Sequence, residues 1–535
     1  MAHGPDLDIG NRYLAAIPDS GLGRISAPGP IVLSPLGVRI KRRAHNRALL
    51  RKCRPVIGSN VMKSVTAAAI LSDYVRRAER QSMRIHLITA ESPESRRLRW
   101  SRLIQFPQLT MPLIAALTPR EHDIYHTDEI VERLDLDRPA DLIGITAPTP
   151  SALHAYEVAD AFRRRRVPVV MGGPHATALP EEAAEHADAV VVGEAEDTWP
   201  RLLEDAAAGR LERFYRSTHR ARLDGQPAPR WDLIKGRHYG RSVTIATRGC
   251  PHRCDYCTIP LLYGPGTMRY RPVDEVAREV AQSPTRAVVF WDDNIGANPR
   301  YSKELFRALA PLGKWWTSQC TATAAKDDEF QRLAAASGCK ALFMGFESIS
   351  QESLDSANKG HNRVAGYRGL IRSLHQHGIA AHLGIMFGFD EDDRGIFRRT
   401  VEFLEDAEVD VTTMSMVVPM PGTPTFQRWH SEGRILTTDW SKYDGKKHCV
   451  FRPARMSPQE LVAGTEWASR RFYSLCSIVR RMWGSRVGLW WNLPRNLGYH
   501  LALRRYPEQG WDPAQTGRGA DAVESVSIHA ATLLP

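Results

Sequence analysis

Three cysteines lie within eight residues of one another, in the order Cys250-x3-Cys254-x2-Cys257. Thiolates at this spacing can cover one face of a soft metal centre, as iron-sulfur clusters require. A structural zinc site normally takes four ligands, and the other five cysteines occur singly, so His252 inside the loop is the fourth ligand that zinc would need. With three protein ligands, a four-iron cluster keeps one iron open for chemistry.

The elements around the cysteines predict a partial barrel of parallel strands. An apolar strand in the segment RSVTIAT precedes the first cysteine, and each later strand is followed by a helical segment. Six such strand and helix units form a partial (β/α)6 barrel, whose active site lies at the carboxyl ends of its strands. The five later strands are predicted near 287–293, 315–321, 341–347, 380–388 and 411–418.

A second α/β pattern precedes the barrel and predicts a doubly wound, Rossmann-like parallel sheet. Its ligand would lie beyond the carboxyl ends of the strands, in the loops 146–150, 171–177 and 193–196. Neither a Gly-x-Gly-x-x-Gly fingerprint nor a phosphate-binding loop occurs there, which argues against a nucleotide. Gly172, Gly173 and Gly193 follow predicted strands, where a glycine usually only forms a turn. A lone histidine such as His175 is likewise more often structural than a ligand. The strands are predicted near 83–90, 121–126, 141–146, 167–172, 188–193 and 213–216.

Length and composition bound the class of protein. A chain of 535 residues with 43% hydrophobic residues is long enough for several cores and is no peptide hormone or lone binding module. Eight cysteines are too sparse for a disulfide scaffold, and the net charge of +12 permits an acidic partner without requiring one. The first residues show no secretory pattern and no run of 18 apolar residues occurs, so we expect a cytoplasmic location.

Composition shifts divide the chain into six parts. We expect a poorly ordered basic extension (1–82), the doubly wound domain (83–220), a Gly- and Pro-rich linker (221–240), the partial barrel (241–430), a helical C-terminal region (431–510) and a disordered tail (511–535).

The motif Cys-x3-Cys-x-aromatic-Cys, with Tyr256 as the aromatic residue, resembles the signature of the radical S-adenosylmethionine (SAM) superfamily. An N-terminal doubly wound domain with Gly-Gly-x-His and Gly-Glu-x-Glu loops, followed by a barrel and a helical tail, resembles the cobalamin-binding class of that superfamily. The resemblance covers residues 83–490. It implies a [4Fe-4S] cluster held by Cys250, Cys254 and Cys257, together with SAM and cobalamin.

The resemblance also implies cofactor contacts. It implies that Asp292 and Asp293 contact SAM, and their alternative role is to cap the N-terminus of the following helix. No Asp-x-His-x-x-Gly motif supplies an axial imidazole to cobalt, and we assign no catalytic residue. On the SAM side the implied residues are Tyr256, Asp292, Asp293, Glu347, Gly384 and Gly388, and on the cobalamin side they are Thr146, Gly172, Gly173, His175, Gly193, Glu194 and Glu196.

The function implied by the resemblance is methylation of an unactivated carbon in a small molecule, a secondary metabolite or a lipid-like compound, through a 5'-deoxyadenosyl radical. An alternative is oxidative cyclisation or rearrangement on the same architecture, which the fold does not distinguish. A tRNA-modifying enzyme and a non-enzymatic metal protein are weaker alternatives, since no nucleic-acid-binding module is evident. An external electron donor of the flavodoxin or ferredoxin type is expected.

The segment from Arg470 to Arg505 holds eight arginines and no acid, interleaved with Trp483, Trp490 and Trp491. Such a stretch could lie as a peripheral contact on an anionic membrane surface. The alternative, which we favour at this point, is a basic helical cap packed against the barrel, because Trp and Leu also pack well inside proteins.

Overall fold

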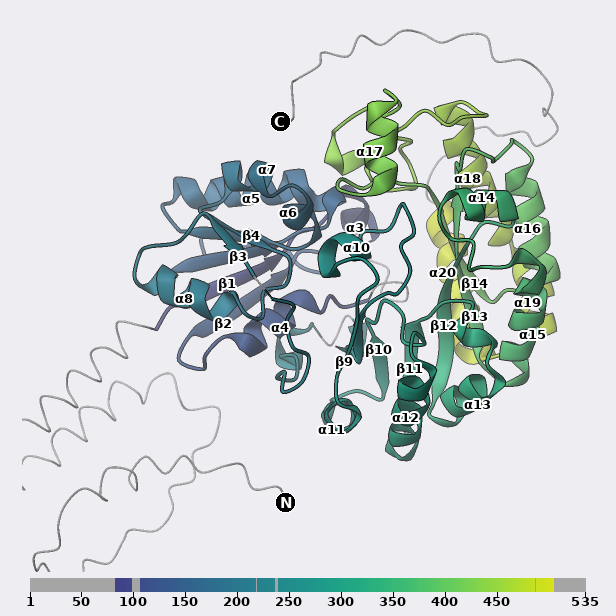
Figure 1. The fold of residues 1–535 in the computed structure, drawn as a ribbon, viewed down its shortest axis with the longest axis horizontal. Coiled ribbons are helices and arrows are strands. Elements are labelled where there is room, and N and C mark those ends of the chain that lie inside the picture. The colour runs from purple at the N-terminus through teal and green to yellow at the C-terminus, as the bar shows by residue number, and fades with distance from the viewer. Residues whose placement is uncertain (1–81, 99–105, 218, 236–238, 486, 505–535) are drawn as a thin grey trace, which may run out of the picture. The chain divides into compact units, whose positions relative to one another are not determined.

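The computed structural model describes residues 82–98, 106–217, 219–235, 239–485 and 487–504 (Figure 1). These residues all belong to one compact unit that begins at residue 81. The predicted disordered tail and nearly all of the predicted basic extension lie outside the described residues. Within the described ranges, no helix is both long enough and apolar enough to cross a bilayer.

The N-terminal domain is built on a sheet of six parallel strands, which confirms the doubly wound prediction. The strand order is β2-β1-β3-β4-β5-β6, so the direction of winding reverses between β1 and β3. At such a reversal the loops diverge and leave a crevice for a ligand at the carboxyl edge. The strands are β1 (Arg84–Thr89), β2 (Asp123–Asp128), β3 (Leu142–Thr146), β4 (Val169–Gly172), β5 (Ala189–Val192) and β6 (Phe214–Arg216).

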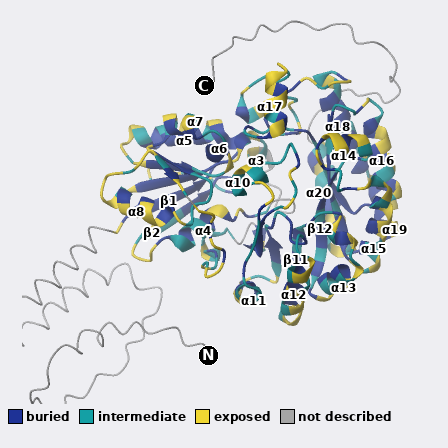
Figure 2. Ribbon diagram, viewed as in Figure 1, coloured by how far each residue is buried: buried dark blue, intermediate teal, exposed yellow. Residues whose placement is uncertain are grey.

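Helices cover both faces of this sheet because its central strands are apolar on both sides. In β4, Val169 and Met171 pack in the core formed with α5 and α7, whereas Val170 packs in the core formed with α4 and α8. Figure 2 shows the buried strands between helices whose outer surfaces are exposed. The helices are α3 (Pro93–Leu98), α4 (Thr110–Leu117), α5 (Ala152–Arg164), α6 (Pro174–Ala178), α7 (Pro180–His186) and α8 (Trp199–Ala207).

The second sheet is the predicted partial barrel, with six parallel strands in the order β14-β13-β12-β11-β10-β7. Each strand is followed by a return helix, so all carboxyl ends meet at one edge. The strands are β7 (Ser242–Thr244), β10 (Ala287–Phe290), β11 (Trp315–Gln319), β12 (Cys339–Glu347), β13 (Ala380–Phe387) and β14 (Val411–Met416).

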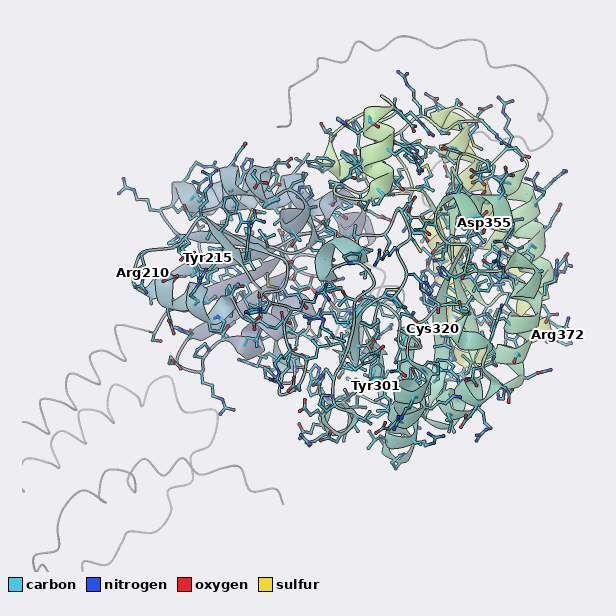
Figure 3. All side chains as sticks on the ribbon, in the orientation of Figure 1. Arg210, Tyr215, Tyr301, Cys320, Asp355 and Arg372 are labelled. Carbon is cyan, nitrogen blue, oxygen red and sulfur yellow. The ribbon has the colours of Figure 1, made fainter. Side chains whose placement is uncertain are left out.

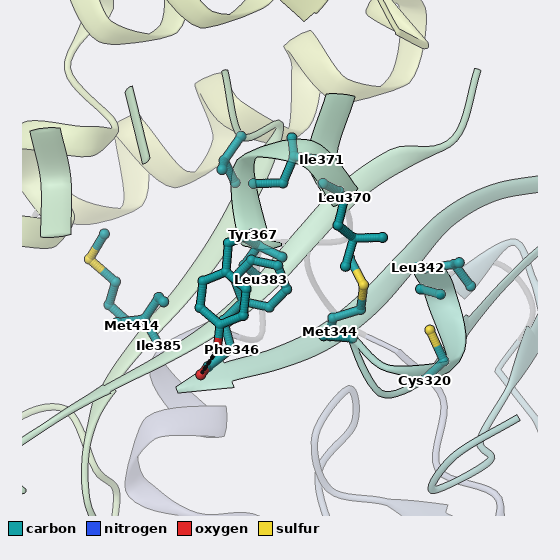
Figure 4. Packing of buried hydrophobic residues seen from close by; sticks show 14 of the residues in the cluster. Cys320, Leu342, Met344, Phe346, Tyr367, Leu370, Ile371, Leu383, Ile385 and Met414 are labelled. Atoms are coloured by element: carbon teal, nitrogen blue, oxygen red, sulfur yellow. Dashed lines mark hydrogen bonds between the residues drawn. The ribbon is translucent and has the colours of Figure 1, made fainter. Parts of the chain in front are cut away.

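The main core lies between this sheet and its outer helices. Met344 and Phe346 point from β12 toward these helices, and the Tyr367 hydroxyl donates a hydrogen bond of 3.0 Å to the Phe346 carbonyl (Figure 4). The helices are α11 (Val273–Gln282), α12 (Pro299–Leu309), α13 (Asp328–Ala336), α14 (Gln351–Ser356), α15 (Tyr367–Gln376) and α16 (Ile396–Asp406).

The C-terminal region expected to be helical from residue 431 begins differently. After α17 (Pro424–Ser431), the chain is irregular up to Met456 apart from a short turn at Trp440–Lys442. Trp440 and Tyr443 join the core of the N-terminal domain instead, so this segment ties the two sheets together. Three helices follow: α18 (Pro458–Phe472), α19 (Leu475–Ser485) and α20 (Leu489–Arg504).

Candidate functional site

The cysteine loop lies beyond the carboxyl end of β7, between β8 (Thr247–Gly249) and α10 (Ile259–Tyr263). Strand β8 pairs antiparallel with β9 (Met268–Tyr270), a hairpin that the sequence analysis missed. Gly249 has a φ of 97°, and a Cβ there would collide with the Thr267 carbonyl oxygen. Only glycine fits this turn, which directs the chain into the loop.

Two other segments, the end of α14 and the start of α17, hold the cysteine loop in place. The Asp255 amide donates to the Ala357 carbonyl over 3.2 Å, and the Thr425 amide donates to the Asp255 carbonyl over 3.1 Å. The Asn358 side chain donates to the Arg253 carbonyl over 2.9 Å. Because both segments bond to it, the loop is pre-shaped by the barrel rather than by its own sequence.

The three sulfur atoms suit a cluster better than a single ion. Among the described residues, the one group of three His, Cys, Asp or Glu side chains with all ligand atoms within 4.8 Å of one another is Glu91, Glu129 and His154, so the cysteine sulfurs are spread more widely. Sulfur ligands of one tetrahedral zinc ion, at about 2.3 Å from it, lie about 3.8 Å apart. A wider spread fits a cluster in which each thiolate binds a different iron.

Burial raises the pKa of all three thiols, and that of Cys257 to about 12. Buried thiols of this kind are weak nucleophiles on their own, and become thiolates when a metal replaces their protons. The donor set therefore fits an iron-sulfur cluster.

Beside the loop, a buried ion pair joins the end of β12 to the segment after α14. Lys359 Nζ lies 2.8 Å from Glu347 Oε1, and the Tyr256 hydroxyl donates to the same oxygen over 3.2 Å. Burial opposes the charge on Lys359, but Glu347 and the neighbouring Cys254 raise its pKa. Glu347 has a φ of 64°, a strained conformation for a side chain of this size. Sequence reasoning found Tyr256 and Glu347 but missed Lys359.

The structure separates the two consecutive aspartates after β10. Asp292 is fully buried, and its carboxylate accepts hydrogen bonds from the Ala246 and Thr247 amides at 3.1 and 2.5 Å, so it shapes the backbone and reaches no ligand surface. Asp293 accepts from the Gly249 amide over 2.7 Å and borders a cavity. Burial raises the pKa of Asp292 to about 7 and that of Asp293 to about 6.

A tyrosine of α12 also fixes the backbone that leads to the cysteines. Tyr301 is labelled among the side chains of Figure 3. Its hydroxyl donates to the Ala246 and Arg271 carbonyls, at 3.1 and 2.8 Å. It thereby holds the chain between β7 and β8 against the chain that follows β9.

The two glycines predicted to face SAM have packing roles in the described structure. A Cβ on Gly384 would lie 2.9 Å from the Phe343 ring, and a Cβ on Gly388 would lie 2.7 Å from Leu461 of α18. Gly388 therefore lets α18 approach the end of β13 and lies in the outer core. The next residue, Phe389, packs against Tyr256 of the cysteine loop at 6.3 Å between ring centres, so a contact of Gly388 with SAM stays a prediction.

Six of the seven residues predicted for cobalamin border one cavity at the carboxyl edge of the N-terminal sheet. The opposite wall comes from the barrel and includes Ile245, Arg248, Tyr263, Trp291 and Asp293. The lining is mostly apolar on both sides, and the cavity extends between the sheet and α4. The six residues are Thr146, Gly172, Gly173, Gly193, Glu194 and Glu196.

Two glycines keep this cavity open. Gly173 has a φ of 93°, and a Cβ there would collide with the Thr146 hydroxyl. Gly193 has a φ of 81°, and the position of its missing Cβ has no atom within 4 Å. A flat ligand such as a corrin ring could approach the backbone here, so these residues fit cobalamin.

The seventh residue, His175, is not part of that cavity. Its side chain is 1% exposed, lies 3.3 Å from the Thr149 hydroxyl and 3.4 Å from Glu182, and contacts the Trp440 ring. It joins the N-terminal domain to the irregular segment after α17, which is the structural role that the sequence analysis kept as the alternative.

Glu194 and Glu196 bind the barrel rather than only lining the cavity. Arg248 Nη1 lies 2.5 Å from Glu194 and 2.6 Å from Glu196, and Arg269 Nη1 lies 2.8 Å from Glu194. Although burial opposes ionisation, Arg269 and Arg248 hold the pKa of Glu194 below its usual range. Sequence reasoning missed both arginines, and the position of Arg248 two residues before Cys250 was the available signal.

Comparison with known families agrees with this geometry. The model of the radical SAM superfamily matches residues 244–404, which include the three cysteines and four barrel strands. The model of the B12 binding domain matches residues 116–203, which include the glycine loops of the N-terminal sheet.

Named relatives cover both domains. Bacteriochlorophyllide d C-12(1)-methyltransferase of Chlorobaculum tepidum is 30% identical over 427 residues, which cover 77% of this chain and 92% of the relative. Hopanoid C-2 methylase of Rhodopseudomonas palustris is 26% identical over 351 residues, 62% of this chain and 66% of the relative.

Two solved structures share the fold. The radical SAM methyltransferase TsrM of Kitasatospora setae, with cobalamin and a [4Fe-4S] cluster bound, gives a TM-score of 0.52 at 18% identity over 66% of this chain and 78% of that one. The cobalamin-dependent radical enzyme OxsB gives 0.58 at 13% identity over 78% and 72%. With both domains in the same order and the cysteine and glycine loops in place, the chain belongs to the cobalamin-binding radical SAM enzymes, the family of its methyltransferase relatives.

Proposed function

We propose that the chain transfers a methyl group to an unactivated carbon of a small molecule. The observation that carries the proposal is a cavity bordered on one side by the glycine loops of the B12 domain and on the other by residues next to the cysteine loop. When bound, the reduced cluster with SAM supplies a 5'-deoxyadenosyl radical and cobalamin supplies the methyl group. The protein must hold these groups together and exclude water.

Different side chains would bind the cluster and the charged groups of SAM. Cys250, Cys254 and Cys257 would hold the cluster, leaving one iron open to SAM. Lys359 offers a buried cation for the SAM carboxylate, and Asp293 offers a carboxylate for its ammonium group.

Three apolar side chains form part of the barrel wall, beside the hydroxyl-bearing Thr247 and Tyr263. Ile245, Leu262 and Trp291 line the barrel side of the cavity, and the Trp291 indole donates to the Pro107 carbonyl over 2.9 Å, so the ring is held in place. An organic radical formed beside such side chains meets no hydroxyl or thiol hydrogen from them.

The substrate class follows from the relatives and the lining together. The relatives' names include bacteriochlorophyllide d and hopanoids, which suggests a large, mainly hydrocarbon skeleton. We propose a substrate of this kind, and a chlorophyll-type tetrapyrrole is the first compound to test.

Cyclisation is the second candidate, because anaerobic magnesium-protoporphyrin IX monomethyl ester cyclase of Cereibacter sphaeroides is 25% identical over 403 residues. The two reactions differ in their products. Methylation releases S-adenosylhomocysteine and 5'-deoxyadenosine in equal amounts, whereas cyclisation releases no S-adenosylhomocysteine.

The test is anaerobic reconstitution with iron, sulfide and hydroxocobalamin, followed by product analysis with SAM and a reductant. We expect stoichiometric cobalamin and 5'-deoxyadenosine release, and loss of that release in Cys254→Ala. Cys476→Ala, which changes an exposed cysteine of α19, is the matched control. Release of 5'-deoxyadenosine by Cys254→Ala would refute the cluster assignment, and loss of cobalamin on washing would refute the two-cofactor proposal.

Partners and location remain part of the proposal. We infer that a flavodoxin or ferredoxin donates the electron, which places the enzyme in the reducing cytoplasm where thiolates persist. Contact with a membrane rests on α19 and α20.

A further inference from the structure

Helices α19 and α20 carry an exposed apolar face. Ten large hydrophobic side chains are exposed among the described residues, and eight of them belong to these two helices. In α19 they recur every four residues, as Leu475 and Val479 show, and in α20 the same spacing gives Leu493, Leu497 and Leu501. Scattered exposed leucines need no explanation, but a continuous stripe does.

The buried face of α20 is mainly polar, and that of α19 mixes polar residues with Ile478 and Met482. In α20, Asn496 is fully buried and donates to the Asp410 carbonyl over 3.0 Å, whereas Leu501 is 57% exposed. In α19, Arg481 is fully buried and donates to the Val409 carbonyl over 2.6 Å, whereas Val479 is 66% exposed. These buried bonds to the start of β14 fix the rotation of both helices, so the apolar face is held outward.

Cations without a carboxylate partner lie beside the α20 end of this face, whereas Arg480 of α19 pairs with Asp406 and Glu405 of α16. Trp490 is 63% exposed and packs against Trp315 at 4.9 Å between ring centres. Arg286 and Lys340 lie over the Trp315 ring at 4.0 and 6.0 Å, and neither has a carboxylate partner among the described residues. The sequence contains no Asp or Glu between residues 467 and 507.

We propose that α19 and α20 dock this face on an anionic lipid surface. The leucines and Trp490 would enter the boundary between headgroups and acyl chains, while Arg286 and Lys340 would meet lipid phosphates. A second copy of the chain would bring the same cations against each other, so charge favours the lipid over self-association. This inference goes beyond the proposed reaction and does not depend on it.

The direct test is flotation of the full-length reconstituted protein with vesicles. Phosphatidylcholine vesicles with phosphatidylglycerol are compared with phosphatidylcholine alone, at low and high salt. We expect binding to the anionic vesicles that weakens with salt, and much weaker binding to the neutral ones. Absence of flotation with the anionic vesicles overturns the proposal.

Two double variants separate the contributions. Leu493→Ser with Leu497→Ser should weaken binding about tenfold, since two half-exposed leucines no longer leave water. Arg286→Gln with Lys340→Gln should weaken binding to anionic vesicles about tenfold and leave neutral vesicles unchanged. Leu153→Ser, which changes an exposed leucine of α5, is the control that should bind normally.

Folding and self-association are measured on the same samples. Thermal unfolding and cobalamin content should match the wild type, because the replaced leucines are exposed. Binding that persists in the leucine variant overturns the proposal. A wild-type dimer that the leucine variant dissociates in sedimentation velocity also overturns it, because a second copy would then cover the face.

Discussion

Replacing Arg248 with methionine removes the guanidinium that joins two glutamates of the B12 domain to the barrel. The side chains of Arg248, Glu194 and Glu196 are only 10, 8 and 13% exposed. Removing one member of a buried ion pair costs about 3–5 kcal/mol, because the remaining charge stays buried and unpaired. Arg269 still pairs with Glu194, so we expect the lower end of that range, about 3 kcal/mol.

Amide hydrogen exchange measures the lost stabilisation locally, in the peptides next to the Arg248 ion pairs. Peptides that cover residues 194–198 and 246–250 should exchange about 100-fold faster in Arg248→Met, since about 1.4 kcal/mol corresponds to a factor of ten. Arg222→Met is the matched control, because its ion pair with Asp224 lies at the surface with Arg222 85% exposed, and it should change exchange less than threefold.

The double variant Arg248→Met with Glu196→Gln tests whether the contact itself carries the effect. Once Arg248 is gone, neutralising Glu196 relieves a buried charge, so the double variant should exchange more slowly than Arg248→Met alone. Unchanged exchange in Arg248→Met, or purely additive effects in the double variant, would refute the reasoning.

Two further predictions concern the cysteine loop and acid stability. Gly249→Ala forces a Cβ against the Thr267 carbonyl and should lower the amounts of iron and sulfide bound after reconstitution. Gly209→Ala is the control, because Gly209 also has a positive φ of 67° but its Cβ would enter open space, so iron and sulfide should bind normally. Equal loading of both variants would show that the strain at Gly249 does not matter for the cluster. Burial lowers the pKa of His86 to about 4, so its contribution to stability is present above pH 6.5 and is lost as the pH falls toward 4. His86→Gln should therefore lose about 2 kcal/mol less than the wild type between pH 7 and 5 in urea unfolding, and equal losses would show that His86 does not govern this window.

Most strands were predictable because they are short apolar runs with clear ends, although β2 (DIYHTD) and β14 (VTTMSM) are partly polar. Segments such as VVMG and AVVF are recognisable as strands from their sequence alone. The helices between successive strands indicate that both sheets are parallel. The hairpin of β8 and β9 was not predictable, since each strand has three residues and includes an arginine or a glycine. Its pairing comes from tertiary contacts, Tyr301 among them.

The candidate site likewise has residues that the sequence reveals and residues that it does not. The cysteines are close in sequence, so their chemistry could be recognised without a structure. Asp292 and Asp293 could not be told apart by composition, although the alternation of side chains at a strand end sends them in opposite directions. Lys359 gave no local signal, because its partner Glu347 lies twelve residues away, with α14 between them.

The position of Arg248 makes the two halves of the site mechanically dependent. The Arg248 side chain holds the Glu194 loop of the cobalamin cavity, and the next residue, Gly249, begins the cysteine loop with its amide bound to Asp293. A shift of either domain therefore moves the backbone that leads to Cys250. The proposed transfer of a methyl group and a hydrogen atom at one carbon would require a fixed separation between the two bound cofactors, and this short stretch of chain joins the residues that would set it.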